Sequence, residues 1–148
     1  MTIHYLRHSP TGFTVLGHWT IAAGGTDYGK MVPWNVRTDL DDVPTMLLTN
    51  HYGGMGCSSE TDTIVALTPT GPEERLRFTV QSSYQRDFDI KHGPGDYNYT
   101  GKIVPMVRGR QFAVNFTGTR SQQVIYNKQP DGTYFNNDTN TSDFPPGC

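Results

Sequence analysis

The sequence predicts an all-β protein whose short strands pack as a two-sheet β-sandwich. No segment of helical length shows a clean period of about 3.6 residues, whereas alternating or β-branched runs are frequent. Glycine, proline, threonine and asparagine are abundant, and this composition favours many strands and turns over long helices. Repeated short strands with turn residues between them are typical of a sandwich or a barrel. A length of 148 residues suits one domain.

The expected strands follow the alternating and β-branched runs in chain order. They cover residues 2–6, 13–22, 45–49, 63–68, 76–81, 88–91, 103–107, 111–117 and 122–127. The segment Pro69-Thr70-Gly71-Pro72 breaks the chain between two of these runs and predicts a hairpin loop. The pair Asp131-Gly132 is a strong signal for a type I′ turn.

Two regions are expected to lie outside the strands. Residues 26–44 form a long, polar and charged connection, and such loops on β scaffolds often carry function. Residues 136–148 are polar, and we expect them to extend over the surface and not to join the core. The sequence therefore predicts a β-sandwich domain over residues 1–130 and a polar C-terminal extension over residues 131–148, with no internal repeat.

Charge and cysteine content limit the expected partners and the location of the protein. The net charge of −2 gives no reason to expect nucleic acid or an acidic membrane as a partner. The two cysteines, Cys57 and Cys148, are expected to be free thiols or to form one optional bridge. The N-terminal residues lack the basic and apolar regions of a signal peptide. We expect a cytoplasmic or non-classically released protein, or an extracellular one if a leader has been removed.

A partial phosphate-loop match is not expected to bind nucleotides. Gly24 to Lys30 fits the G-x-x-x-x-G-K pattern, but Met31 stands where a serine or threonine hydroxyl should meet magnesium. Pro33 follows soon after, and no predicted helix is available to direct its N-terminus at a phosphate. Nucleotide binding is therefore not part of the prediction.

Metal binding also has little support in the sequence. The histidines have no compact ligand spacing, and there is no C-x-x-C motif. They are His4, His8, His18, His51 and His92. Asn136, Asp138 and Asn140 alternate as in a calcium loop, but the required glycine and the closing glutamate are absent. We therefore expect no metal and no other cofactor.

Catalysis rests on one weak candidate, the acidic cluster of Asp39, Asp41 and Asp42. Two carboxyl groups at a suitable separation can hydrolyse a glycosidic bond. An acidic run beside Pro44 also fits a solvated loop, and no serine or cysteine nucleophile has a recognisable local signature. The sequence therefore predicts a protein that is not an enzyme.

Three groups of residues are suited to binding a sugar. The glycines of residues 53–56 let a ligand approach backbone amides. Tyrosines near turns can stack on the apolar face of a sugar; they are Tyr52, Tyr84, Tyr97 and Tyr99. Donors and acceptors are mixed at Arg86, Asp89, Lys91 and His92. Taken alone, these groups also fit a flexible hairpin, half-buried sheet residues and a surface charge cluster.

The order of several short motifs resembles that of the fungal fruit-body lectins, small sugar-binding β-sandwiches with an actinoporin-like fold. The motifs are Pro10-Thr11-Gly12-Phe13, Trp19, Ala23-Gly24-Gly25-Thr26, Gly53-Gly54-Met55-Gly56, Tyr84-Gln85-Arg86 leading into Asp89-Ile90, and Gly109-Arg110-Gln111-Phe112-Ala113-Val114. The resemblance spans about residues 10–117. It implies a six-stranded sheet packed on a four-stranded one, oligomers, no metal, and sites for the galactose–GalNAc disaccharide and for GlcNAc-type sugars.

The resemblance, together with the tyrosines, gives the expected carbohydrate-binding residues. They are Ala23, Gly24, Tyr52, Gly53, Gly54, Gly56, Ser82, Ser83, Tyr84, Asp89, Ile90, Lys91 and His92. The chain departs from the lectin pattern at Ser82-Ser83, where the family places a His-Asn pair. The stretch between Ile90 and Gly109 is shorter than in the family, and residues 30–44 look like an insertion.

The expected function is that of a lectin that binds galactosyl/GalNAc or GlcNAc-type glycans without catalysis. Its expected partners are glycans or glycoproteins and further copies of the same chain, with membrane contact only through glycans. A membrane-active, actinoporin-like cytolysin is the first alternative, although it requires an amphipathic N-terminal helix that the strand alternation of the first 30 residues does not favour. Glycan hydrolysis by the acidic cluster is the second.

Overall fold

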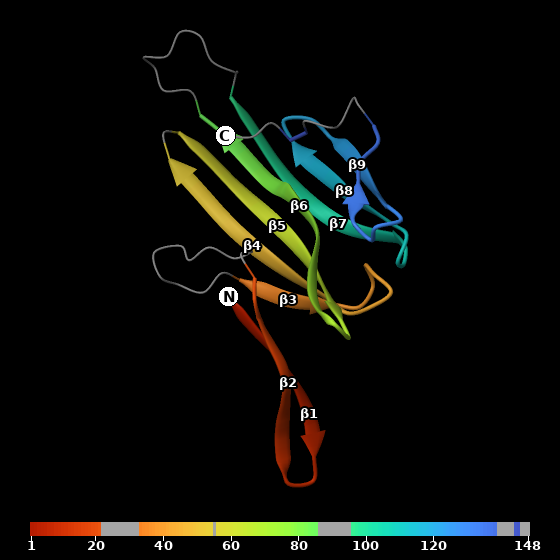
Figure 1. Cartoon of the computed structure of the whole chain (residues 1–148). Coiled ribbons are helices and arrows are strands. Elements are labelled where there is room, and N and C mark those ends of the chain that lie inside the picture. Colours follow the sequence, from red (N-terminus) through yellow and green to blue (C-terminus); the bar gives the residue numbers. More distant parts are fainter. Residues whose placement is uncertain (22–32, 55, 86–95, 139–143, 146–148) are drawn as a thin grey trace.

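The structure is a computed structural model that describes residues 1–21, 33–54, 56–85, 96–138 and 144–145 (Figure 1). These residues form strands in two sheets and contain no helix, which confirms the predicted all-β class and the presence of two sheets. The strands are β1 Thr2–Ser9, β2 Gly12–Thr20, β3 Trp34–Arg37, β4 Thr45–Gly54, β5 Cys57–Thr68, β6 Gly71–Tyr84, β7 Tyr97–Val107, β8 Gln111–Gly118, β9 Gln122–Lys128 and β10 Tyr134–Phe135.

The two sheets are of very different size. Strands β3 to β10 form one antiparallel sheet in chain order, and β1 pairs only with β2 among the described strands. The division into six and four strands that the lectin resemblance implies is therefore wrong for the described residues. The physical reason is that each strand from β4 to β9 hydrogen-bonds to its two neighbours in sequence, so the meander stays in one sheet.

Most of the expected strands are confirmed, and the structure extends several of them. The hairpin loop at Pro69-Thr70-Gly71-Pro72 and the turn at Asp131-Gly132 connect β5 to β6 and β9 to β10. The expectation that all of residues 26–44 form a loop is wrong at β3, a short edge strand whose Val36 pairs with Met46. The sequence did not predict β10 either. The expected strand at 88–91 lies outside the described residues.

The main core lies on the inner face of the large sheet and is rich in aromatic side chains. Phe112 is fully buried and packs against Phe78, Tyr126 and Tyr134 with ring centroids 5.1 to 6.0 Å apart. The sheet curves so that β10 contacts β6, which encloses these rings. Burial raises the pKa of Tyr126 to about 12, consistent with a phenol inside the core.

The core extends beyond residue 130. Tyr134 is buried, and its hydroxyl donates a hydrogen bond to the carbonyl oxygen of Leu40 at 3.0 Å. Phe144 is 8% exposed, packs edge-on against Tyr99 and Phe116, and has the guanidinium of Arg120 above its ring. At Phe144 the expectation that the tail lies outside the core is wrong, because a single aromatic ring in a polar segment is enough to dock it.

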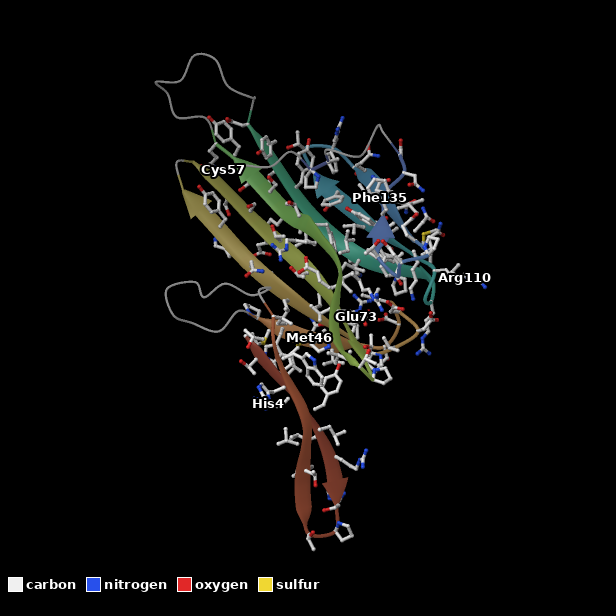
Figure 2. The ribbon with its side chains drawn as sticks, in the orientation of Figure 1. His4, Met46, Cys57, Glu73, Arg110 and Phe135 are labelled. Carbon is white, nitrogen blue, oxygen red and sulfur yellow. The ribbon has the colours of Figure 1, made fainter. Side chains whose placement is uncertain are left out.

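The β1–β2 hairpin projects away from the large sheet (Figure 1). Its base packs on the outer face of the sheet, where Ile3 and Ile21 cover Met46 and Val65; Figure 2 shows Met46 at this junction. The indole of Trp19 lies over Gly71, where a Cβ would be 2.6 Å from its Nε1. Most of the other hairpin side chains are exposed.

Candidate functional site

The register of strands β4 to β7 brings part of the expected site together at one end of the sheet. Gly53 lies opposite Ser58, and Ser58 lies opposite Ser83. Cys57 follows the same pattern between Gly54 and Tyr84, and Figure 2 shows Cys57 at this end of the molecule. We call the group of Tyr52, Gly53, Gly54, Gly56, Ser83 and Tyr84 the sheet-end cluster.

The glycines of the sheet-end cluster serve two purposes. Gly56 has a φ of +79°, and a Cβ there would meet the carbonyl oxygen of Gln85 at 2.6 Å, so the turn itself requires glycine. Cβ atoms added at Gly53 and Gly54 would have no neighbour nearer than 3.5 Å. At these two positions the backbone is accessible, as the binding prediction requires.

The serines and tyrosines of the expected site divide between core and surface. Ser82 is fully buried and its hydroxyl donates to Tyr97 Oη at 3.5 Å, so it faces the protein interior and not a ligand. Tyr84 stacks on Tyr97 with ring centroids 6.0 Å apart, as a half-buried sheet residue. Tyr52 is 61% exposed and is therefore the tyrosine available for stacking on a sugar.

Several expected residues fall outside the described residues. They are Ala23, Gly24, Asp89, Ile90, Lys91 and His92. Cys57 is disulfide-bonded, which resolves for this residue the choice between free thiol and bridge. The other cysteine of the chain, Cys148, also lies outside the described residues.

A hollow of about 360 Å³ is lined by residues of β3 to β7, and sequence reasoning missed it. We call it the inner-face groove. Leu47, Val80 and Ile103 supply its apolar surface, and these side chains pack with the main core. Its other lining residues, from β3, β4, β5 and β7, are Arg37, Thr49, Glu60, Asp62, Gly101 and Lys102. Apolar surface with a few convergent polar groups is the usual character of a ligand site.

The inner-face groove contains both donors and acceptors. Asp62 is 5% exposed and accepts a hydrogen bond from Thr49 Oγ1 at 2.6 Å. Burial raises the pKa of the Asp62 carboxyl, the Thr49 hydrogen bond opposes that shift, and nearby Glu60 adds to it. His51 Nδ1 lies 3.8 Å from Glu60 Oε1, and His51 precedes Tyr52 of the sheet-end cluster along β4. Strand alternation therefore turns the Tyr52 side chain to the opposite face of β4 from Leu47 and Thr49 of the groove.

The raised pKa of Asp62 gives a test that separates function from stability. A raised folded-state pKa means that ionised Asp62 costs stability above that pKa, and that the cost disappears as the pH falls toward the unfolded value of 3.8. We expect Asp62→Asn, which keeps an oxygen for Thr49, to raise the melting temperature at pH 7. Thermal unfolding from pH 7 down to about pH 4 should show the gap between variant and wild type closing. A variant less stable than wild type at pH 7 would contradict this.

The candidate catalytic cluster of Asp39, Asp41 and Asp42 is occupied by ion pairs. Asp39 accepts two hydrogen bonds from Arg37, at 2.9 and 2.7 Å. Asp41 is 1% exposed; its Oδ1 lies 2.6 Å from Lys128 Nζ and its Oδ2 lies 3.8 Å from Arg75 Nε. Asp41 therefore presents no carboxyl group to a substrate, and the cluster is organised to join loop 38–44 to β6 and β9.

The described residues contain neither a metal-binding group of acidic, histidine or cysteine side chains nor a helix that could span a membrane. Among them there is no group of three or more histidine, cysteine, aspartate or glutamate residues that could hold a metal. His4 and His18 stack on each other across the β1–β2 hairpin, with centroids 6.0 Å apart. No helix in the described part of the chain is long and apolar enough to cross a membrane.

Comparison with known proteins identifies no relative. The chain matches no protein-family model, no curated protein and no solved structure at a significant level. The resemblance to the fruit-body lectins therefore stays a prediction.

Proposed function

We propose that this protein is a carbohydrate-binding lectin that acts without catalysis through the inner-face groove. The supporting observation is the composition of the groove, in which charged groups and a hydroxyl surround apolar side chains. A sugar ring has the same two characters, because its hydroxyls donate and accept while its C–H faces are apolar. Arg37 would donate to hydroxyl oxygens, and Glu60 and Asp62 would accept from hydroxyl groups.

The preferred ligands are galactosyl/GalNAc or GlcNAc-type glycans, as the lectin resemblance implies. A sugar in the groove would extend along β4 toward Gly53, which lies on the same face of this strand as Leu47 and Thr49. Each hydroxyl exchanges water for protein, so affinity at a single site is expected to be weak. Partners would be glycans or glycoproteins, with membranes contacted only through their glycans, and no cofactor is needed.

Removing the charge of Arg37 should weaken glycan binding. We expect Arg37→Ala to lower affinity about tenfold, equivalent to about 1.4 kcal/mol, because the groove loses a charge-assisted donor. A glycan array on the purified protein followed by calorimetry with the best ligand would measure this. Arg110→Ala, at an exposed cation in the β7–β8 turn (labelled in Figure 2), is the matched control. Equal affinity of Arg37→Ala and wild type for every ligand found would contradict the groove assignment.

Glycan hydrolysis is a second candidate, now favoured by Glu60 and Asp62 and not by the Asp39–Asp42 cluster. Both residues line the groove. The Cα atoms of residues two apart on a strand lie about 6.6 Å apart with their side chains on one face, which is a suitable spacing for the two carboxyl groups of an inverting glycosidase. The raised pKa of Asp62 suits a general acid. Release of reducing sugar from the array's glycans by wild type, and none by Asp62→Asn, would replace the lectin proposal with this one.

The cytolysin alternative receives no specific support. It requires an N-terminal amphipathic helix, whereas Thr2–Ser9 and Gly12–Thr20 form the β1–β2 hairpin. Leakage of a dye from liposomes that lack glycans would revive it.

We propose that the exposed side of the β1–β2 hairpin binds a second copy of the chain, which would give a weak lectin avidity. Register and alternation place Leu6, Phe13 and Val15 on one face, and these side chains are 52 to 70% exposed. Residues 1–21 contain Arg7 and three histidines but no acidic residue, so all 14 acidic residues lie in the rest of the chain. This charge complementarity favours the acidic body of another copy over a cationic partner.

Oligomerisation through the hairpin is tested by mass. Wild type should show a mass above the 16.5 kDa of one chain by light scattering, and Phe13→Asp should shift it to the monomer. Thr14→Asp, on the opposite face of the hairpin, is the control for added charge. A wild-type monomer at about 100 µM, well above typical weak-dimer dissociation constants, would contradict the proposal.

A further inference from the structure

A second hollow, of about 410 Å³, lies over β8 and β9 and is closed on one side by the residues that follow β10. We call it the amide hollow, because five of its lining side chains are amides. The residues are Gln111, Gln123, Ile125, Asn127, Asn136, Asn137 and Asp138. None of them lines the inner-face groove. Of these residues, Asn136 and Asp138 also belong to the weak calcium-loop pattern in the sequence.

Strand register arranges the amides in rows across the sheet. Gln111 lies opposite Asn127, and Gln111 Nε2 donates to Asn127 Oδ1 at 2.8 Å. Gln123 lies opposite Asn115 and donates to its Oδ1, also at 2.8 Å. Each side-chain amide has two N–H donors and an oxygen with two acceptor sites, so one bond between partners fixes the geometry and leaves capacity for a ligand.

Apolar surface separates and borders these rows. Ala113 lies opposite Ile125 between the two amide pairs, and Ile125 lines the hollow. Phe135 lies opposite Asn127 across β9 and β10, so its ring is on the same face of the sheet, where it is 58% exposed. Figure 2 shows Phe135 near β9, far from Met46 and the hairpin. A sugar has polar hydroxyls and apolar C–H faces, and oriented amides beside an exposed aromatic ring can contact both.

The charge of the amide hollow restricts its ligand. Asp138 is the one ionisable residue among those that line it, and no lysine or arginine is present. Phosphates and sulfated or carboxylated sugars would therefore lack a cationic partner. Asn136 Oδ1 accepts a hydrogen bond from the backbone N–H of Asp138 at 2.9 Å, which orders this wall of the hollow.

We infer that the amide hollow is a binding site for a neutral hexose or N-acetylhexosamine residue of a glycan, independent of the inner-face groove. Paired amides would hold neighbouring hydroxyls in bidentate fashion, Ile125 would contact the C–H surface of the ring, and Phe135 would stack on the adjoining residue. The inference does not depend on the proposed function, because the two hollows share no residue.

The experiment titrates ¹⁵N-labelled protein with the methyl glycosides of galactose, GalNAc, GlcNAc and glucose while following side-chain NH₂ signals by NMR. The protein is made in a host without N-glycosylation, because Asn137-Asp138-Thr139 is a sequon. We expect at least one sugar to shift the NH₂ signals of Gln111 and Asn127. Asn127→Ala and Phe135→Ala should each weaken that sugar's binding about tenfold. Asn50→Ala, at an amide in β4 that lines neither hollow, is the control and should leave it unchanged.

Each outcome decides between the two sites. If no sugar shifts these amide signals, or if the dissociation constant is the same in Asn127→Ala, Phe135→Ala and wild type, the inference is wrong. Binding that is lost only in Arg37→Ala would also overturn it while supporting the groove. Binding lost only in the amide-hollow variants would support the inference and count against the proposed function. Gln123→Ala, at an exposed position, gives the same test if Asn127→Ala fails to fold.

Discussion

Asp41→Ala is expected to lower the free energy of unfolding by about 3 kcal/mol. Asp41 is 1% exposed and accepts a hydrogen bond from Lys128 Nζ at 2.6 Å, while Arg75 Nε lies 3.8 Å from its other oxygen. Removing one member of a buried ion pair leaves the other charges desolvated without compensation, which typically costs about 3–5 kcal/mol. Lys128 and Arg75 are partly exposed, at 21% and 13%, so we take the lower end of that range.

The cost should appear as a fall in melting temperature of about 6–12 °C, measured by circular dichroism without reductant so that the Cys57 disulfide stays intact. Asp39→Ala is the matched control, because its carboxylate is 50% exposed and its pairing with Arg37 is worth less than about 1 kcal/mol. If the two variants lose equal stability, Asp41 does not organise this end of the fold.

The Asp39–Asp42 cluster also shows where sequence reasoning fails. Three aspartates beside a proline give the same pattern whether they are solvated, catalytic or buried, because the difference depends on partners far along the chain. Lys128 is 87 residues from Asp41, and Arg108 donates to its carbonyl oxygen from the β7–β8 turn. Strand alternation is local, and for that reason β4 to β9 were predictable.

The two hollows were beyond prediction for the same reason. The inner-face groove needs β3, β4, β5, β6 and β7 in register, and the edge strand β3 has too few alternating residues to be recognised. In the sheet-end cluster, Tyr52 and the glycines are local features of one hairpin, so the sequence alone could place them together. It could not tell that Ser82 points into the core, because that depends on Tyr97 and Tyr99 of the neighbouring strand.

Both hollows belong to one continuous sheet, so the stability of that sheet limits either binding proposal. Phe112→Ala is expected to cost about 4 kcal/mol in unfolding free energy, because Phe112 is fully buried and large-to-small changes in a core lose both transfer energy and packing. Its ring stacks on Tyr126 at 5.1 Å and meets Tyr134 edge-on at 5.1 Å, so the variant loses contacts on two sides. Urea unfolding followed by circular dichroism would measure the change.

Phe135→Ala removes a phenylalanine side chain that is exposed, whereas Phe112→Ala removes one that is buried. Because the side chain is the same, the difference in unfolding free energy between the two variants reports the effect of burial. Phe135 is 58% exposed, so its loss should change the unfolding free energy by less than about 0.5 kcal/mol. Similar losses in the two variants would mean that the aromatic cluster around Phe112 is not the main source of stability. A large loss in Phe112→Ala alone, together with a stable Phe135→Ala, would also establish that weaker sugar binding in Phe135→Ala reports on the amide hollow itself, since the sheet beneath it would be intact.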